Sequence, residues 1–455
     1  MSTVIAAIAT PPAAAGIGVI RLSGEDAIAV ADKVFRPLAG NKTLSAQAGY
    51  TALYGHVYDA EGDVDDCVAL VFRAPHSYTG ENVVELSCHG GLYLLRRCLR
   101  ACIEAGAIPA EAGEFTKRAF LNGKMDLTGA DAVMDLIGAG GALAARAALA
   151  AREGSIFRRT EQIKANLLAV AAQNAAYVDY PDDDIPELSP LVLDGTLAEA
   201  EEALSALLHT FDAGRMLQEG IDTVIVGTPN VGKSTLMNRL SGTERSIVTA
   251  QAGTTRDIVE DSVRVGDLVL RLSDTAGIRE TDEEVEAIGI RRARDRMKGA
   301  ALILAVFDGS RPLNSDDLAL AAEVSGDHTV AILNKADQPP KADRRLLEQH
   351  ISHIVPLSAK TGEGVDTLTA VIAEITGLAG LDENAGILTT ERQRDGVRRA
   401  LEAVKEAREA LASGLAIDAA AVSIDAAIAA LQELTGERAS ESVVNEVFAR
   451  FCVGK

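Results

Sequence analysis

The chain has 455 residues, of which 47% are hydrophobic and 24% charged, and its formal net charge is −22. A chain of this length predicts about two to four globular domains, each able to bury a core. The acidic balance argues against broad electrostatic binding of nucleic acid, because that mode needs a basic surface that neutralises phosphates. Any contact with RNA must therefore use a local basic patch or a partner protein.

Signals for membranes and secretion are missing from the sequence. No stretch approaches the roughly 18 uninterrupted apolar residues of a membrane span, and the N-terminus has no basic region before its apolar stretch. The five cysteines form no CxxC pair and are too few for a disulfide framework; they are Cys67, Cys88, Cys98, Cys102 and Cys452. We therefore expect a soluble cytoplasmic protein with reduced thiols and no membrane contact.

The first half of the chain divides by composition. Residues 1–118 carry short apolar runs punctuated by Gly and Pro, which predict an α+β domain of strands and interspersed helices. From 119 to 215 the sequence is rich in Ala and Leu with long 3.6-residue periodicity, which predicts helices. Pro and adjacent Asp residues at 180–190 favour turns, so we expect an exposed loop between these helices.

The second half changes character twice. Between 216 and 380 short apolar runs alternate with helical segments, which predicts a parallel, doubly wound sheet. Helical periodicity returns over 381–455. The simplest architecture is a nucleotide-binding domain at 216–380 inserted into a helical domain that consists of 119–215 and 381–455.

The string GTPNVGKS, from Gly227 to Ser234, follows a predicted strand and precedes a predicted helix. In that context GxxxxGK[ST] forms a loop whose backbone N–H groups cradle phosphate. Lys233 can reach the terminal phosphates, and the Ser234 hydroxyl can bind Mg²⁺. The predicted nucleotide contacts in this motif are Asn230, Val231, Gly232, Lys233, Ser234 and Thr235.

Three further motifs, DTAG, NKAD and SAK, follow in order at the ends of predicted strands. The Asp of DTAG can organise Mg²⁺, and its Gly N–H can meet the γ-phosphate. NKAD selects guanine, because Asp337 can accept hydrogen bonds from N1–H and from the exocyclic amine, and SAK completes the base side. The predicted GTP contacts here are Asp274, Thr275, Ala276, Gly277, Asn334, Lys335, Asp337, Ser358, Ala359 and Lys360.

The residues that would assist hydrolysis lie near these motifs. AGTTRD at 252–257 occupies the expected place of switch I, where Thr255 can complete the Mg²⁺ shell. The amide oxygen of Asn230 can coordinate a monovalent cation in place of an arginine finger, although Asn also simply favours turns. Ile278 stands where Ras-like GTPases have a water-orienting Gln. The candidates for that task are Glu280, Asp282, Glu283, Glu284 and Glu286.

The combination of GTPNVGKS, AGTTRD, DTAGIRE with EVEAIGI, and NKAD resembles the bacterial tRNA-modifying GTPase family MnmE. Segments 9–24, 79–91, 113–127 and 451–455 are similar to motifs of that family too, so the resemblance covers essentially the whole chain. It implies a homodimeric, K⁺-activated GTPase with a Ras-like G domain. The family works with the flavoprotein MnmG and a one-carbon tetrahydrofolate, and adds an aminomethyl-type group to carbon 5 of the wobble uridine of certain tRNAs.

The resemblance also implies roles for individual residues. It selects Glu286 as the catalytic carboxylate and places GTP contacts at Thr249, Thr254 and Thr255. The implied metal contacts are Ser234 and Thr255 for Mg²⁺, and Asn230, Thr249, Gln251 and Thr254 for K⁺. The implied folate contacts, where basic groups suit the glutamate tail of the cofactor, are Arg21, Glu85, Lys124 and Lys455.

Alternatives remain open at several positions. Cys452 is either a functional thiol or a small anchor of the C-terminal segment, in which Val453 departs from the more usual Ile of the family. Cys98 and Cys102 are expected in the core rather than in a metal site with His89. Candidate RNA contacts, each alternatively a solvated face balanced by acidic neighbours, are Arg96, Arg97 and Arg100, Lys117 with Arg118, and Arg392, Arg394, Arg398 and Arg399.

The rival function is that of a regulatory or assembly GTPase, which binds partners and performs no modification chemistry. A pure switch of that kind needs no folate site. The N-terminal residues therefore discriminate between the two functions.

Overall fold

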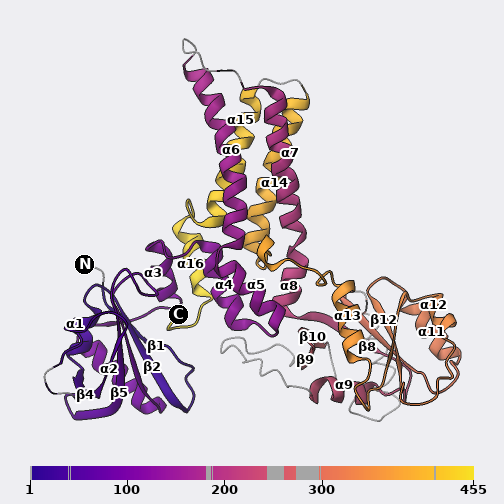
Figure 1. Cartoon of the computed structure of the whole chain (residues 1–455), viewed down its shortest axis with the longest axis horizontal. Coiled ribbons are helices and arrows are strands. Elements are labelled where there is room, and N and C mark those ends of the chain that lie inside the picture. The colour runs from indigo at the N-terminus through magenta and orange to yellow at the C-terminus, as the bar shows by residue number, and fades with distance from the viewer. Residues whose placement is uncertain are drawn as a thin grey trace. The chain divides into compact units, whose positions relative to one another are not determined.

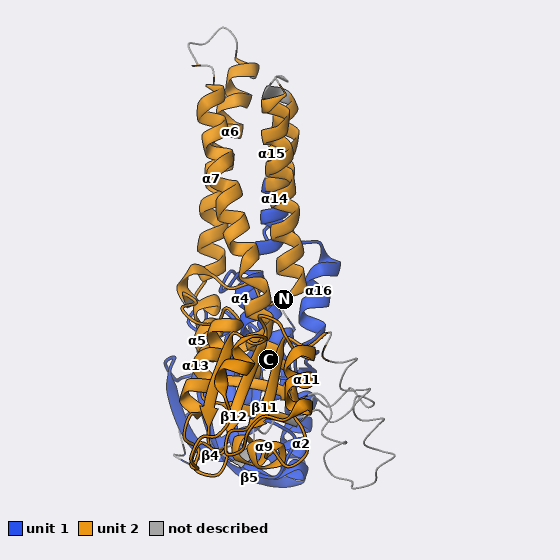
Figure 2. Cartoon of the chain, turned by 90° about the vertical axis from the view of Figure 1, so that its right-hand side faces the viewer, with its two compact units in different colours: residues 1–134, 428–455 blue, residues 135–427 orange. Residues whose placement is uncertain are grey.

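A computed structural model of the chain describes residues 3–38, 40, 42–180, 186, 188–242, 261–272, 297, 299–413 and 417–455. The chain forms two compact units, which Figure 2 colours separately. The first unit contains residues 1–134 and 428–455, and the second contains residues 135–427. Helices α4 (Leu127–Gly138) and α15 (Ile417–Thr435) cross from one unit to the other.

Within its described residues the first unit holds a seven-stranded sheet of order β3-β4-β5-β6-β2-β1-β7, labelled in part in Figure 1. The pairing is antiparallel except between β1 and β7. The strands are β1 (Ile5–Ile8), β2 (Ala15–Ser23), β3 (Phe35–Pro37), β4 (Thr51–Asp59), β5 (Gly62–Phe72), β6 (Val83–Gly90) and β7 (Ile108–Pro109). The helices are α1 (Ala27–Asp32), α2 (Leu92–Glu104), α3 (Glu114–Leu121) and α16 (Glu441–Ala449), so the predicted α+β character is confirmed.

Helix α2 covers the sheet with an apolar stripe. Leu95, Cys98 and Cys102 recur at helical spacing, and all three are buried in one core with the sheet residues Ile20 and Leu22. The prediction that the two cysteines are core residues is therefore confirmed. His89 is exposed and bonds Asp65 through Nδ1 at 2.7 Å, and no potential metal cluster occurs among the described residues.

The C-terminal segment 450–455 lies against the start of α3. Val453 forms an antiparallel bridge with Ala112, and the Phe115 N–H donates to the main-chain oxygen of Lys455 at 3.1 Å. Gly454 has a φ of +97°, and a Cβ added there would lie 2.5 Å from the carbonyl oxygen of Ile8. The close contact between residue 454 and Ile8 therefore requires glycine, both for its backbone conformation and for the lack of a side chain.

The second unit contains long helices that run side by side in Figures 1 and 2, where they are labelled α6, α7 and α14. Helix α7 buries Leu193, Leu197, Leu204 and Leu207, which share one helical face. Helical character is thus confirmed on both sides of the nucleotide motifs. The helices are α5 (Ala142–Arg152), α6 (Ser155–Asp179), α7 (Pro190–His209), α8 (Phe211–Glu219) and α14 (Glu391–Ala412). In the described parts of the chain, no helix is both long enough and apolar enough to span a bilayer.

The second unit also contains a six-stranded sheet of order β13-β12-β11-β8-β10-β9 in its described residues, parallel except for β9. Its strands are β8 (Ile221–Val226), β9 (Asp261–Val265), β10 (Leu268–Leu272), β11 (Leu302–Asp308), β12 (Thr329–Asn334) and β13 (His353–Leu357). The helices are α9 (Lys233–Gly242), α11 (Ser315–Glu323), α12 (Arg344–Glu348) and α13 (Val365–Ile375), and η1 (Glu383–Ala385) is a short 3-10 turn. The predicted alternation of strands and helices is confirmed.

This sheet is buried on both faces. Along β11, Leu304 and Val306 belong to one apolar cluster with Leu236 of α9, whereas Ala305 and Phe307 belong to a second cluster with other helices. Because alternate residues of a strand face opposite sides, the continuous apolar run of β11 fills both cores. Helices on both faces leave the loops at the strand ends as the available surface for a ligand.

We expect Gly454→Ala to loosen the C-terminal segment, because the new Cβ meets the Ile8 oxygen and the φ disfavours a side chain. Hydrogen exchange at the Phe115 amide should accelerate by about 5- to 150-fold, for a strain of about 1–3 kcal/mol. Gly106→Ala is the matched control, since Gly106 has a φ of +118° with no atom within 4 Å of an added Cβ. Equal protection in both variants would contradict close packing at Gly454.

Candidate functional site

The phosphate-binding motif forms the turn between β8 and α9. Asn230 and Gly232 have positive φ values of 63° and 100°, so the chain turns tightly before it enters the helix. A Cβ on Gly232 would collide with the side-chain nitrogen of Asn334. The turn directs the chain into the N-terminus of α9, which begins at Lys233, and exposed Ser234 and Thr235 lie in its first turn. N–H groups at that helix end suit an anion.

Lys233 places its charge at the loop itself. Its ammonium donates to the carbonyl oxygens of Gly227 and Thr228 at 2.6 and 3.0 Å. A compact ammonium group on a flexible stem can exchange such carbonyl contacts for phosphate oxygens. The loop therefore combines a fixed backbone turn with a movable positive charge.

Asn334 joins the phosphate loop to the loop after β13. Its Nδ2 donates to the carbonyl oxygen of Val231 at 2.8 Å, and its Oδ1 accepts from the Ala359 N–H at 3.0 Å. The side chain is only 2% exposed, so both halves of the amide need these partners. Three of the sequence-predicted residues are thus brought together by a single side chain.

Asp337 and Ser358 form the outer part of the same junction. The exposed Asp337 accepts a hydrogen bond from the buried Ser358 hydroxyl at 2.7 Å. This bond orients the carboxylate, which can still accept from the guanine edge because a carboxylate has several lone pairs. Lys360 is exposed beside them, and its carbonyl oxygen accepts from Arg239 of α9.

A set of supporting ion pairs and hydrogen bonds was not predicted from the sequence. Lys335 donates to Asp308 at 2.6 Å, and Thr228 donates to Asp317 at 2.8 Å. Arg311 pairs with Asp317 at 2.7 Å. Although burial alone raises the pKa of Asp308, hydrogen bonds from Lys335 and Ser310 outweigh it, so that pKa is lowered. The sequence signal that could have indicated these contacts is the group of acidic and basic residues that follows the end of β11 at Asp308.

Several predicted residues lie outside the described residues and stay predictions. They belong to segments 243–260 and 273–296. They are Thr249, Gln251, Thr254 and Thr255 near switch I, Asp274, Thr275, Ala276 and Gly277 of DTAG, and the carboxylate candidates Glu280, Asp282, Glu283, Glu284 and Glu286.

A second cluster forms in the first unit around Arg21 of β2. Its Nε donates to Glu85 of the neighbouring strand β6 at 2.8 Å, in register across the sheet, and its Nη1 donates to the carbonyl oxygen of Gly454 at 3.1 Å. The guanidinium lies 5.8 and 5.6 Å from the ring centroids of Tyr78 and Phe115, within cation–π range. Two predicted residues and the C-terminal segment therefore meet at one place.

The other predicted members of this cluster lie on neighbouring segments. Exposed Lys124 donates to the carbonyl oxygen of Pro75 at 3.1 Å, in the same loop as Tyr78. The main-chain oxygen of Lys455 accepts from Phe115, whose ring contacts Arg21. Cys452 is exposed, so it remains a candidate functional thiol.

The candidate RNA-contact arginines are largely neutralised by acidic neighbours. Arg97 pairs with Asp59 and Glu61, and Arg398 pairs with Asp395 and Glu402. These pairs favour the alternative of balanced charged faces. Arg118, Arg394 and Arg399 also form ion pairs.

The phosphate-binding loop between β8 and α9, on a sheet that is parallel except for β9 and buried on both faces, defines a nucleotide-binding protein of the P-loop class. The chain matches the family model of the MnmE helical domain over residues 127–452 and that of the GTP-binding protein TrmE N-terminus over residues 4–124.

Whole-chain relatives agree with these family models. The tRNA modification GTPase MnmE of Symbiobacterium thermophilum is 41% identical, and that of Geobacter metallireducens is 39% identical. Each alignment covers 99% of this chain and 99% of the relative. The chain belongs to the MnmE family of tRNA modification GTPases.

We expect Asp337→Asn to weaken GTP binding and to shift preference toward xanthine nucleotide. The new amide accepts from one guanine donor but opposes the other, donor to donor. Hydrogen bonds to a charged group contribute about 1.5–3 kcal/mol each, so the GTP affinity should fall on the order of 10²-fold. Equilibrium binding of GTP and XTP measures this. Retention of the parental preference for GTP would show that another group reads the base.

Proposed function

We propose that this chain is a K⁺-activated GTPase that acts with the flavoprotein MnmG on tRNA in the cytoplasm. In the proposed reaction a one-carbon tetrahydrofolate is used to add an aminomethyl-type group to carbon 5 of the wobble uridine. The proposed organisation is a folate-binding and dimerisation domain at 1–118, a helical domain at 119–215 and 381–455, and a Ras-like G domain at 216–380. The active form is a homodimer.

One observation carries the proposal beyond GTP hydrolysis, namely the meeting of Arg21, Glu85 and the C-terminal segment. A reduced pterin offers adjacent N–H donors that suit a carboxylate such as Glu85, and aromatic Tyr78 lies beside the same guanidinium. Lys124 and Lys455 supply charge for the glutamate tail of a folate. A switch without modification chemistry has no use for such a cluster.

In the G domain we assign the residues as follows. Ser234 and Thr255 would hold Mg²⁺, which neutralises charge that develops on the phosphates. Asn230, at the positive-φ corner of the loop, would contribute its amide oxygen to K⁺ together with Thr249, Gln251 and Thr254. Glu286 would orient the attacking water for in-line displacement.

Hydrolysis should be faster in K⁺ than in Na⁺, since the amide oxygen of Asn230 helps to form a cage whose size favours one ion. An arginine finger contributes about 10³–10⁵ to turnover, so the K⁺ advantage should reach at least about tenfold. Asn230→Ala should lose the advantage but keep much of the GTP affinity, because Lys233 and the loop N–H groups remain. Steady-state rates of GTP hydrolysis in matched KCl and NaCl measure this advantage. Equal rates of the parent chain in the two salts would exclude a role of K⁺ in hydrolysis.

The folate assignment is tested by equilibrium binding of 5-formyltetrahydrofolate to the full chain. We expect saturable binding by the parent and a loss of about tenfold or more in Arg21→Ala, because Glu85 and the C-terminal segment lose their shared partner. Arg36→Ala is the matched control, since Arg36 also pairs with a carboxylate and lies over a tyrosine ring. A parent chain that binds no folate would favour the regulatory GTPase instead.

A further inference from the structure

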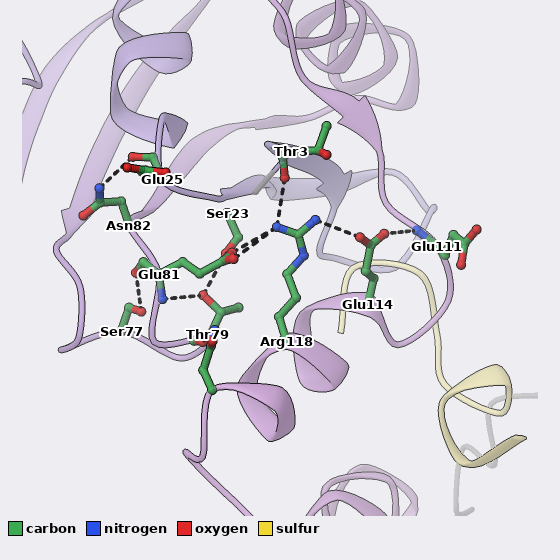
Figure 3. Close-up of polar contacts among 11 residues, drawn as sticks. Thr3, Ser23, Glu25, Ser77, Thr79, Glu81, Asn82, Glu111, Glu114 and Arg118 are labelled. Atoms are coloured by element: carbon green, nitrogen blue, oxygen red, sulfur yellow. Dashed lines mark hydrogen bonds and ion pairs between the residues drawn. The ribbon is translucent and has the colours of Figure 1, made fainter. Parts of the chain in front are cut away.

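Arg118 of α3 lies at the centre of a polar network in the first unit, shown in Figure 3. Its Nη1 donates to the Thr3 carbonyl oxygen at 2.9 Å and to Glu81 at 3.1 Å, and its Nη2 donates to Glu114 at 2.9 Å. The side chain is only 14% exposed. Because these bonds occupy the guanidinium, it is poorly placed to bind a phosphate backbone. We therefore look for its role in contacts within the protein.

The first arm of the network runs through Glu81 to the end of β2. Glu81 accepts from the Ser23 hydroxyl at 2.8 Å, and Ser23 shares a hydrogen bond of 2.7 Å with Thr79. Both hydroxyl residues are fully buried. The Glu81 N–H also donates to the Thr79 hydroxyl at 3.2 Å. These bonds hold the loop 74–82 in one conformation against the sheet.

The loop 74–82 carries one wall of the cluster around Arg21. Tyr78 lies against the Arg21 guanidinium, and its hydroxyl shares a 2.8 Å hydrogen bond with Thr116 of α3. The Pro75 carbonyl oxygen of this loop accepts from Lys124. Movement of the loop would therefore displace both an aromatic ring and a basic side chain of the proposed folate site.

The second arm of the network runs through Glu114 to the opposite wall. The other oxygen of Glu114 accepts from the Glu111 N–H at 2.8 Å, which holds segment 111–115. That segment binds the C-terminal residues through two main-chain hydrogen bonds. The Gly113 N–H donates to the carbonyl oxygen of Cys452 at 3.4 Å, and the Phe115 N–H donates to the main-chain oxygen of Lys455. The C-terminal residues in turn provide the Gly454 carbonyl oxygen to Arg21.

We propose that Arg118 is a positioning residue that holds both walls of the Arg21 cluster, the loop 74–82 through Glu81 and the C-terminal segment through Glu114. This inference rests on the proposed folate function for its ligand. The planar fork of an arginine can bind two carboxylates in different directions at once, whereas a lysine ammonium on its flexible stem cannot reproduce that fixed geometry. Arg118 holds the loop 74–82 through the carboxylate of its member Glu81, and it reaches the C-terminal segment through the carboxylate of Glu114.

The first experiment measures binding of 5-formyltetrahydrofolate to the full chain. Arg118→Ala should weaken binding by about tenfold or more, because partners that orient a binding group contribute on that scale. Arg97→Ala is the matched control: Arg97 also binds two carboxylates in the same unit and is 23% exposed. Both variants should lose thermal stability, but only Arg118→Ala should lose folate affinity, and GTP affinity should be unchanged in both.

Arg118→Lys keeps the charge and replaces Arg118→Ala in the binding test if the Ala variant does not fold. Its folate affinity should stay about threefold or more below the parent, since one ammonium cannot maintain both arms. Parental affinity in Arg118→Lys, or in a folded Arg118→Ala, would overturn the inference. Loss of binding in Arg21→Ala together with that result would leave the proposed function intact.

Hydrogen exchange without folate separates this inference from the proposed function. Arg118→Ala should expose two amides together, that of Glu81 in the loop 74–82 and that of Phe115, which donates to Lys455 of the C-terminal segment. Arg97→Ala should leave both protected. That result would support the positioning role even if the parent chain bound no folate. Unchanged protection of the two amides in Arg118→Ala would overturn it.

Discussion

The hydrogen bond from Arg21 to the Gly454 carbonyl oxygen joins residues that are 433 positions apart in the chain. It can form only if the C-terminal end of the chain returns to the sheet that the N-terminal strands form. Helix α4 leaves the first unit and α15 re-enters it, and helices occur on both sides of the nucleotide-binding strands in the sequence. The contact thus brings the C-terminal segment back to the sheet of the first unit.

The nucleotide site follows a different constraint, the burial of its sheet on both faces. Residues of β11 fill two separate cores, so the loops at the strand ends are the surface available to a ligand in the described part of this sheet. Asn334 then links the phosphate loop to the base-side loop with one buried amide. Because both of its polar atoms are satisfied internally, the two loops are preorganised as one surface.

Sequence patterns predicted the G-domain elements well, because buried parallel strands are continuous apolar runs and their motifs occur at the strand ends. Strand β8, the loop after it and the Asp337 loop all follow from that local pattern. The pairing of Thr228 with Asp317, 89 positions away, has no local signature. Arg118 was grouped with Lys117 as a basic pair for the same reason, since its partner Glu81 lies 37 positions away.

The first-unit cluster was predicted only in part. Arg21 and Glu85 were identified by resemblance, and their pairing across β2 and β6 gives that choice a geometric basis. Tyr78 and Phe115 were missed, because an aromatic residue in a sequence gives no indication of which cation it will contact. The contribution of the C-terminal backbone was also beyond prediction, since a carbonyl group is present at every residue.

We propose that GTP hydrolysis by this chain is coupled to modification of the wobble uridine. The most direct measurement is mass spectrometry of tRNA nucleosides from cells that lack the gene, complemented with the parent or with Glu286→Ala. We expect the parent to restore the carbon-5 modification and the variant to leave the uridine unmodified while it still binds GTP. An unchanged modification in the cells that lack the gene, or full restoration by Glu286→Ala, would contradict the account.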